Sequence, residues 1–285
     1  MQKFQFYTPR SVDDALAFLS HNAEQTKIIA GGTDLIPSLR QEDLQPAFVL
    51  NILEIGALRG ITEQDHRIRI RPTTTFTEMV ESPVLNRHFP SLVQAAAFVG
   101  GPQIRNRGTI GGNIGTASPA ADVLPAVLAL DGELELQSKR SGTRYIPLSR
   151  AIAAPYKPLF QPDEILTGII LPKLNPEARS TFVKVGRRNA MARARMNLAV
   201  VLGMNREKVI TEMRIVPGAV MPVARRMERA EGALLGKKPE PPVVDAAAEA
   251  LAKEMVEVTG TRWSTEYKFH VLQNLFKGVL GRLTA

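Results

Sequence analysis

The segment Thr109–Asp122, TIGGNIGTASPAAD, places three glycines within its first seven residues. A second glycine pair lies in Ala30–Leu35 (AGGTDL), at the end of the short β-branched run Lys27–Ala30. Glycine has no Cβ, so the backbone can approach a ligand closely and successive N–H groups can converge on an anion. The two segments together therefore predict a site that grips a diphosphate from both sides.

Neither segment has the G-x-G-x-x-G pattern of a Rossmann fold or the Walker A pattern of a P-loop, so these two nucleotide sites are excluded on the residues. The side chains of Thr33, Thr109 and Asn113 can add hydrogen bonds to those of the backbone. For one glycine pair taken alone, a tight structural turn is the alternative. Asp34 would repel a phosphate, and we expect it to cap the following helix instead.

The sequence around the shorter segment predicts a small βαβ unit. Lys27–Ala30 is its first strand, an apolar helix face follows from Leu35 to Leu39, and Phe48–Ile52 is its second strand. The alternating run Arg67–Arg71 predicts a half-buried strand in a following sheet. A domain boundary is expected near residue 55.

A second boundary is expected near residue 177, because the two prolines of Pro172–Ala178 (PKLNPEA) disfavour both a helix and a central strand. Before this linker we expect helices at 75–80, 92–99 and 122–130 and strands at 133–137 and 165–171. Beyond it we expect strands at 181–185, 197–204 and 209–216 and helices from about Pro222, Val243 and Ser264. In the last helix a stripe at i, i+3, i+4 spacing favours core packing over a partner surface; its residues are Phe269, Leu272, Leu275, Phe276, Val279, Leu280 and Leu283.

The composition excludes several kinds of chemistry. None of the 285 residues is cysteine, so the chain forms no disulfide, thiolate zinc site, cysteine-ligated iron–sulfur cluster or cysteine nucleophile. Its four histidines show no metal-ligand spacing, and we expect no metal site. No apolar run is long enough to span a membrane, and the N-terminus lacks the apolar core of a signal peptide, which favours a cytoplasmic protein.

The net charge is +8, which could serve nucleic acid or an acidic protein surface. With one Trp and four Tyr the chain has few stacking platforms, and it carries no nucleic-acid-binding motif, so we expect no nucleic acid partner. The densest basic run, GRRNAMARARMN at Gly186–Asn197, is interpreted as a solvated or subunit-facing patch.

The two glycine segments, with GPQIRN at Gly101–Asn106, resemble the FAD-binding medium subunit of the molybdenum hydroxylases, the family of xanthine dehydrogenase and aerobic carbon monoxide dehydrogenase. The resemblance covers essentially the whole chain. It includes KFQFYTPRSVDDAL near the N-terminus, LRGI at Leu58–Ile61, EILTGIILP at Glu164–Pro172 and FVKVGRR at Phe182–Arg188. The motifs are specific when taken together.

The resemblance implies an α+β chain with a p-cresol methylhydroxylase type FAD-binding fold. Residues 1–55 would form a small βαβ FAD-binding subdomain, and residues 56–177 a larger FAD-binding subdomain with a mixed sheet. Residues 178–285 would form a C-terminal domain with a three-stranded antiparallel sheet and a helical bundle.

The resemblance also implies that FAD is bound without a covalent link and that both glycine segments hold its diphosphate. Asp122 falls where the family touches the cofactor, Leu166 where it makes an apolar contact to the flavin ring, and Lys184 where a lysine lies near that ring. A helix cap, a buried strand leucine and an exposed strand lysine are the respective alternatives. The expected cofactor-binding residues are Ile29, Ala30, Gly31, Gly32, Thr33, Asp34, Thr109, Ile110, Gly111, Gly112, Asn113, Asp122, Leu166 and Lys184.

In this family electrons pass from a molybdopterin site in a large subunit through two 2Fe-2S clusters in a small subunit to FAD in a chain of this kind, and then to NAD, oxygen or a quinone. A chain without cysteine fits this division, because it must leave the clusters to a partner. We therefore expect an electron-transfer subunit with no catalytic residue of its own, in a xanthine dehydrogenase-like complex arranged as a dimer of heterotrimers. A Gly111→Asp change is expected to weaken FAD binding, because its side chain and charge would stand where the diphosphate approaches.

Two alternatives remain at this stage. One is a self-contained FAD-dependent reductase of the same fold, like UDP-N-acetylenolpyruvoylglucosamine reductase, and the other is a basic interaction protein without a cofactor. The chain also departs from the family after GRRNA, where it continues MARARMNLAV with Arg193 and Arg195. The electron acceptor and the subunit contacts are the properties that this departure concerns.

Overall fold

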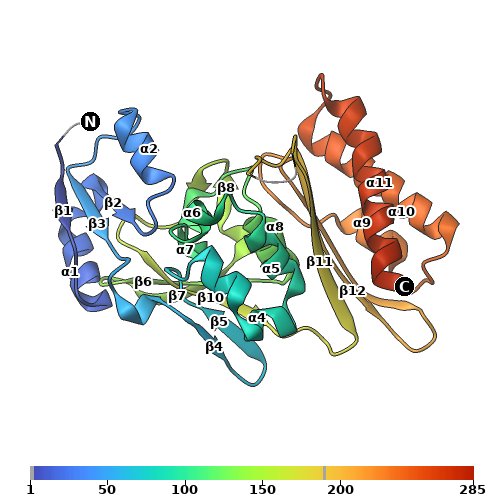
Figure 1. Ribbon diagram of the computed structural model, residues 1–285, viewed down its shortest axis with the longest axis horizontal. Coiled ribbons are helices and arrows are strands. Elements are labelled where there is room, and N and C mark those ends of the chain that lie inside the picture. The colour runs from blue at the N-terminus through green and yellow to red at the C-terminus, as the bar shows by residue number, and fades with distance from the viewer. Residues whose placement is uncertain (1–2, 189–190) are drawn as a thin grey trace. The chain divides into compact units, whose positions relative to one another are not determined.

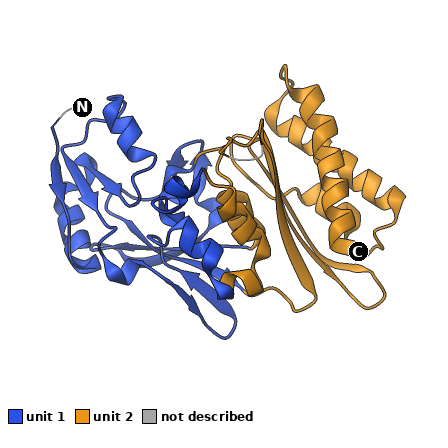
Figure 2. Ribbon diagram, viewed as in Figure 1, with its two compact units in different colours: residues 1–84, 101–117, 131–172 blue, residues 85–100, 118–130, 173–285 orange. Residues whose placement is uncertain are grey.

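The computed structural model describes residues 3–188 and 191–285. The chain forms two compact units that do not follow chain order (Figure 2). Unit 1 comprises residues 1–84, 101–117 and 131–172, and unit 2 comprises residues 85–100, 118–130 and 173–285. The three consecutive domains with boundaries near 55 and 177 stay a prediction.

The small sheet of unit 1 confirms the predicted βαβ unit (Figure 1). Its strands β1 (Gln5–Tyr7), β3 (Phe48–Asn51) and β2 (Thr26–Ile29) lie in that order, and β3 is parallel to both neighbours. Helix α1 (Val12–Asn22) begins at Ser11, whose side chain accepts a hydrogen bond from the Asp14 N–H. Apolar residues of α1 pack with those of β3 and the turn that follows, which closes this part of the core.

The large sheet of unit 1 has five strands in the order β4-β5-β10-β6-β7. These strands span Ile61–Glu63, Arg67–Ile70, Ile165–Pro172, Glu133–Ser138 and Gly142–Pro147, respectively. Every neighbouring pair is antiparallel, so the mixed sheet predicted for this region is wrong. The reason is the position of β10. Strands β5 and β6 run in the same direction, but β10 lies between them and is antiparallel to both.

The remaining elements of unit 1 are short. Helices α2, α3, α6 and α7 span Leu35–Arg40, Phe76–Glu81, Pro102–Arg105 and Ile110–Thr116, and β8 and β9 form a hairpin at Ile152–Ala154 and Lys157–Pro158. Short 3-10 turns lie at Ala23–Gln25, Gly56–Leu58 and Leu148–Arg150. Helix α4 (Pro83–His88) contains the boundary at which the chain passes from unit 1 to unit 2. Helix α3 starts with a capping box between Thr75 and Glu78, which fixes the backbone next to α7.

Unit 2 is built on the predicted three-stranded antiparallel sheet, in the order β11-β12-β13 (Figure 1). The strands span Ala178–Val185, Met196–Met204 and Ile210–Gly218. Helices α5 (Pro90–Ala97) and α8 (Val123–Ala129) pack on this sheet. Helices α9, α10 and α11 span Glu228–Leu234, Pro241–Thr259 and Thr265–Thr284. The fold class predicted from the sequence is confirmed.

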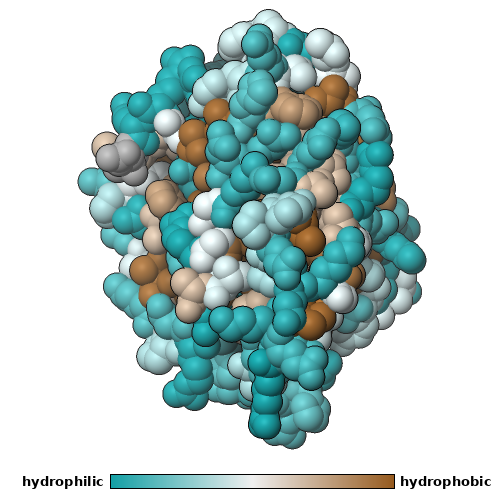
Figure 3. Space-filling model, turned by 90° about the vertical axis from the view of Figure 1, so that its right-hand side faces the viewer, coloured by the Kyte–Doolittle hydropathy of each residue, from teal (hydrophilic) through white to brown (hydrophobic). Residues whose placement is uncertain are grey.

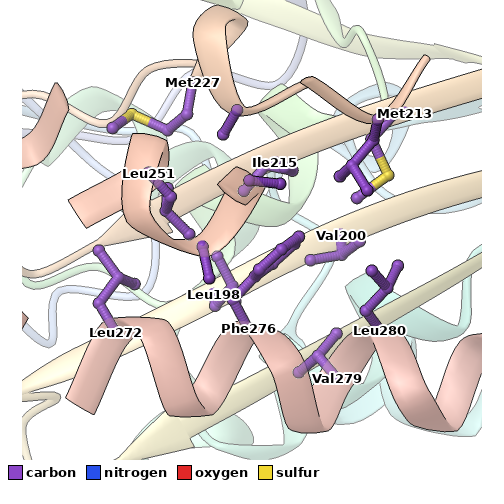
Figure 4. Packing of buried hydrophobic residues seen from close by; sticks show 14 of the residues in the cluster. Leu198, Val200, Met213, Ile215, Met227, Leu251, Leu272, Phe276, Val279 and Leu280 are labelled. Atoms are coloured by element: carbon purple, nitrogen blue, oxygen red, sulfur yellow. The ribbon is translucent and has the colours of Figure 1, made fainter. Parts of the chain in front are cut away.

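The main core of unit 2 lies between the sheet and helices α9 to α11 (Figure 4). Leu198 and Val200 of β12 point into it, opposite Leu251 of α10 and Phe276 of α11. The intervening residues of β12 are buried as well, because α8 contacts that strand. This double burial explains why β12 is a continuous apolar run instead of an alternating one.

The predicted role of the last helix is confirmed, since Leu272, Phe276, Val279, Leu280 and Leu283 are buried in this core. The helix predicted from about Pro222 instead begins at Glu228. Ala219 has a left-handed backbone (φ 60°), and the Met227 N–H donates to the Ile215 carbonyl, so the chain between them is held along β13. Within the described residues, no helix is long and apolar enough to cross a membrane.

Candidate functional site

The first glycine segment is the turn between β2 and α2. The Ile29 carbonyl, at the end of β2, still accepts a hydrogen bond from the Ile52 N–H, and Gly32 then adopts a left-handed backbone with φ 74°. Throughout the described part of the chain, no acceptor binds the backbone N–H groups of Gly31–Asp34. Four consecutive donors are thus available, as in the backbone nests that bind anions.

Gly31 brings the two glycine segments together inside unit 1. A Cβ on Gly31 would lie 2.0 Å from the Arg107 carbonyl oxygen and 3.0 Å from the Gly108 Cα, directly before Thr109. The Thr116 hydroxyl at the end of α7 lies 3.4 Å from a carboxylate oxygen of Asp34. Both segments therefore face the same part of unit 1, as the diphosphate hypothesis requires.

The second glycine segment is the helix α7 itself, capped by the Thr109 hydroxyl. Its first N–H groups already have acceptors. Ile110 donates to the Thr74 carbonyl (3.1 Å), Gly111 to the Pro72 carbonyl (2.8 Å) and Gly112 to the Thr109 hydroxyl (3.1 Å). The expectation that the N–H groups of this segment converge on an anion is therefore wrong, because the protein uses them itself.

The packing of α7 against Pro72 gives a different reason for the glycine at position 111. A Cβ on Gly111 would lie 2.5 Å from the Pro72 Cβ and 2.7 Å from its carbonyl oxygen. A Gly111→Asp side chain would therefore collide first with the protein. The Pro72–Thr75 segment, which sequence reasoning missed, supports α7, and Thr73 and Thr74 are fully buried. A run of three threonines after a strand was the available signal.

What α7 offers a ligand is its side chains. The side chain of Asn113 forms no hydrogen bond to any described residue, and its Oδ1 is buried. The glycines at 112 and 115 on the same helix are exposed. A buried amide oxygen without a partner is costly, so the geometry suits a ligand that donates a hydrogen bond here.

Asp34 stands at the N-cap position of α2, but its side chain forms no cap hydrogen bond. Its backbone is helical (φ −104°, ψ −42°), whereas a capping residue is extended, so the predicted cap is wrong. Its carboxylate is exposed and near Thr116 instead. Ala30 and Thr33 are half-buried, while Ile29 and Leu166 are buried, the latter beside an irregularity in the pairing of β10 with β6.

Unit 2 carries the other two predicted side chains, Asp122 and Lys184, as a buried ion pair. The Lys184 Nζ lies 2.5 Å from Asp122 Oδ2 and donates to the Phe98 carbonyl at 3.1 Å. The two side chains are only 5% and 8% exposed, so the reading of Lys184 as an exposed strand lysine is wrong. Asp122 precedes α8 but does not cap it, because its carboxylate is committed to Lys184.

Asn197 completes this cluster and was missed from the sequence. Its Nδ2 donates to Asp122 Oδ1 at 3.0 Å, while its Oδ1 is buried and has no partner among the described residues. A Cβ on Gly218, its neighbour across the sheet, would lie 2.1 Å from that Oδ1. Burial raises the pKa of Asp122, and the Lys184 ammonium and the Asn197 amide oppose this rise.

The described part of the chain contains no group of three or more histidine or acidic side chains that could hold a metal ion. Arg187, Arg188, Arg193 and Arg195 of the basic run are exposed, as expected for a solvated or subunit-facing patch. Residues 189 and 190 of this run lie outside the described residues.

Unit 1 places the free N–H donors of Gly31–Asp34 beside helix α7, on a small parallel sheet and an antiparallel one. This arrangement defines a nucleotide-cofactor domain without a Rossmann fold. Residues 2–174 match the family model described as the FAD binding domain in molybdopterin dehydrogenase. Residues 181–283 match the CO dehydrogenase flavoprotein C-terminal domain. The chain therefore belongs to the family of FAD-binding medium subunits of the molybdenum hydroxylases, and it is an oxidoreductase subunit with FAD as its cofactor.

Individual relatives agree along the whole chain. The putative xanthine dehydrogenase FAD-binding subunit of Escherichia coli (strain K12) is 31% identical over 98% of this chain and 96% of its own length. The nicotine 6-hydroxylase medium subunit of Paenarthrobacter nicotinovorans is 32% identical over 96% and 94%, respectively. A solved carbon monoxide dehydrogenase from Hydrogenophaga pseudoflava superimposes with a TM-score of 0.91 at 29% identity, over 98% of this chain and 96% of that one.

The residues of unit 1 fit FAD. The N–H groups of Gly31–Asp34 are unoccupied donors for an anionic group, and the unpaired Asn113 Oδ1 can accept a hydrogen bond from a cofactor hydroxyl or amide. The exposed carboxylate of Asp34 is the one local feature that disfavours a phosphate.

Proposed function

We propose that this chain is the FAD-carrying electron-transfer subunit of a multi-subunit molybdenum hydroxylase. It would receive electrons from 2Fe-2S clusters in a small partner subunit and pass them to NAD, oxygen or a quinone. A large partner subunit would hold the molybdopterin and the substrate. The assembly we expect is a dimer of heterotrimers in the cytoplasm.

The observation that carries this proposal is the full-length match to chains named as FAD-binding or medium subunits. This chain covers 96% of the Escherichia coli relative, so it contains the same parts as a chain that is named as one subunit. It has no cysteine to ligate a cluster. The clusters of such an enzyme would therefore have to be held by another chain.

We infer that unit 1 binds FAD through the backbone donors of Gly31–Asp34, with Asn113 as a side-chain contact and Leu166 as an apolar one. When bound, FAD supplies the acceptor and donor of one or two electrons at a time. The remaining predicted contacts in the first segment are Ile29 and Ala30, and those in the second are Thr109, Ile110, Gly111 and Gly112. For the second group, the contact would be made by side chains and Cα atoms because the N–H groups are used internally.

We infer a different role for unit 2. The buried ammonium of Lys184 would stabilise negative charge on a reduced flavin, with Asp122 limiting how much net charge is buried. This chain needs no acid or base of its own for outer electron transfer, so we assign it no catalytic residue.

We infer that the complex is of the xanthine dehydrogenase kind. The relatives are nevertheless named for xanthine, nicotine and carbon monoxide, so chains similar to this one carry the names of chemically different substrates. The substrate would then be recognised in the large subunit, and this chain would contribute only the path to the acceptor.

Purification of the complex from its native host through a tag on this chain tests the proposal. We expect molybdenum, iron and flavin in the preparation, and flavin absorbance that is lost on anaerobic addition of the substrate. A tagged chain that is colourless and gains no flavin absorbance when FAD is added would refute it. Oxidation of NADPH by the chain alone with UDP-N-acetylenolpyruvoylglucosamine would instead establish the self-contained reductase.

A further inference from the structure

Two aromatic side chains are exposed where α10 connects to α11 in unit 2. Trp263, the single tryptophan of the chain, is 97% exposed, and Tyr267 in the first turn of α11 is 46% exposed. Trp263 borders a hollow that is also lined by Val256 and Phe269. Tryptophan and tyrosine are enriched among the residues that dominate protein interfaces, where their rings become buried.

The same place carries positive charge that the chain does not balance. The Arg195 guanidinium lies 6.0 Å from the centre of the Tyr267 ring, which joins the basic run to the start of α11. Arg262 and Lys268 flank the aromatic pair in sequence, and desolvation together with Arg262 lowers the pKa of Lys268. Across the described residues, none of these three cations forms an ion pair.

Acidic groups near these cations offset only part of their charge. Glu257, which also lines the hollow, is paired with Arg229 on α9. Glu266 is the remaining carboxylate of the hollow. The face of the molecule that carries α10 and α11 is otherwise mainly hydrophilic, with hydrophobic residues in separate patches (Figure 3). Trp263 and Tyr267, with more cations than carboxylates near them, are thus a local feature of this face.

We propose that Arg195, Arg262, Trp263, Tyr267 and Lys268 form a basic aromatic surface that docks an acidic face of a partner subunit. This inference rests on the proposed function, which supplies the partner. Charge complementarity selects an acidic occupant, because a carboxylate-rich face would pair with cations that form no ion pair with the described residues. The hollow beside Trp263 favours a protein over a nucleic acid, because its apolar lining by Val256 and Phe269 suits an inserted side chain.

The single tryptophan allows a direct test. The chain is labelled with 5-fluorotryptophan, and the fluorine NMR signal of Trp263 is compared between the isolated chain and the complex reassembled with the unlabelled molybdenum and iron–sulfur subunits. We expect the signal to shift and to lose its response to solvent on assembly. An unchanged signal in an assembled complex overturns the inference, while failure of the wild-type chain to assemble counts against the proposed function instead.

Matched variants give the energetic test by affinity measurement with the same partner subunits. Trp263→Ala and Arg195→Glu are expected to weaken assembly at least about 30-fold, the effect of losing one dominant interface residue. Arg206→Glu makes the same charge change in the β12–β13 turn, at the other end of the sheet, and is expected to change affinity less than about twofold.

Tyr267→Phe keeps the ring beneath Arg195 and should assemble like the wild type, whereas Tyr267→Ala should not. Each variant is first checked for wild-type circular dichroism and FAD content, so that misfolding is distinguished from lost docking. Equal affinities for Arg195→Glu and Arg206→Glu overturn the inference. So does a stronger response of Trp263 to duplex DNA than to the partner subunits.

Discussion

The glycine segments of unit 1 and the Asp122–Lys184 cluster of unit 2 achieve their geometry by opposite means. In unit 1 the backbone is brought close by the absence of side chains, and Gly31 has no room for even one carbon beside Arg107. In unit 2 long polar side chains are buried, and their charges compensate each other. The first region should therefore be sensitive to added volume, and the second to removed charge.

The largest effect should come from breaking the charge balance of unit 2. Asp122→Ala leaves the Lys184 ammonium buried, with the carbonyl and the ring of Phe98 as its remaining partners among the described residues, and we expect a loss of about 3 to 5 kcal/mol in the free energy of unfolding. Urea denaturation checks this value. The double variant Asp122→Ala, Lys184→Met removes both charges and should recover much of the loss. If the double variant is as unstable as the sum of both single variants, charge compensation is not what the cluster provides.

The next effect should come from adding volume to unit 1. We expect Gly31→Ala to cost about 3 kcal/mol, the upper range for overpacking, and to abolish FAD binding, because a Cβ would overlap the Arg107 carbonyl. Gly115→Ala is the control, since a Cβ there meets no atom within 4 Å. FAD titration and thermal unfolding of both variants make the comparison. Wild-type FAD affinity in Gly31→Ala would remove the first glycine segment from the site.

A smaller effect should come from adding volume beside the polar cluster of unit 2. Gly218→Ala places a Cβ 2.1 Å from the Asn197 Oδ1, and we expect it to cost about 1 to 3 kcal/mol. In an Asn197→Ala background the same change should cost less, because the colliding oxygen is gone and only the contact with the Pro125 Cγ, 2.5 Å from that Cβ, remains. A double-mutant cycle by urea denaturation measures the difference. Identical costs in the two backgrounds would show that Gly218 is constrained by Pro125 alone.

The smallest effect concerns pH. The folded-state pKa of Asp122 is raised above 3.8, so the folded protein holds this proton more tightly than the unfolded chain does. The contribution that protonation of Asp122 makes to stability is therefore largest at low pH and is lost as the pH rises from 3.8 through the folded-state pKa. The hydrogen bonds that Lys184 and Asn197 donate to Asp122, which Asp122→Ala removes, are a separate contribution. Asp122→Asn lacks this contribution, and the difference in unfolding free energy between wild type and variant should change with pH in that direction. A difference that moves the opposite way would show that Lys184 dominates over burial.

Much of the fold followed from local patterns. The βαβ unit, the three strands of the C-terminal sheet and the apolar stripe of α11 were each visible in the spacing of apolar residues, because that spacing reports which face an element buries. The antiparallel pairing of those three strands was implied by the family resemblance. The assignment of α5 and α8 to the same compact unit as the C-terminal sheet was not visible. Their contacts with β11 and β12 join residues far apart in the chain, and no local period encodes such a pairing.

The candidate site also combines features that the sequence indicated with features that only the tertiary contacts revealed. Glycine composition pointed to both segments, but it did not reveal how their N–H groups are used. Helix α7 donates its own N–H groups to Pro72 and Thr74, whereas the four N–H groups of Gly31–Asp34 have no acceptor among the described residues. Likewise, Lys184 in the sequence is a strand lysine, and only its packing against Asp122 and Phe98 makes it a buried cation.

The sequence by itself determined the family, the secondary structure of most elements and the lack of any cysteine to hold a cluster, because these depend on residue identity and spacing along the chain. The tertiary structure decided which backbone donors remain free, which carboxylate a lysine meets and why Gly111 and Gly218 have no room for a side chain. Those properties depend on what a residue touches across the fold, and contacts of that kind are created only when distant segments pack together.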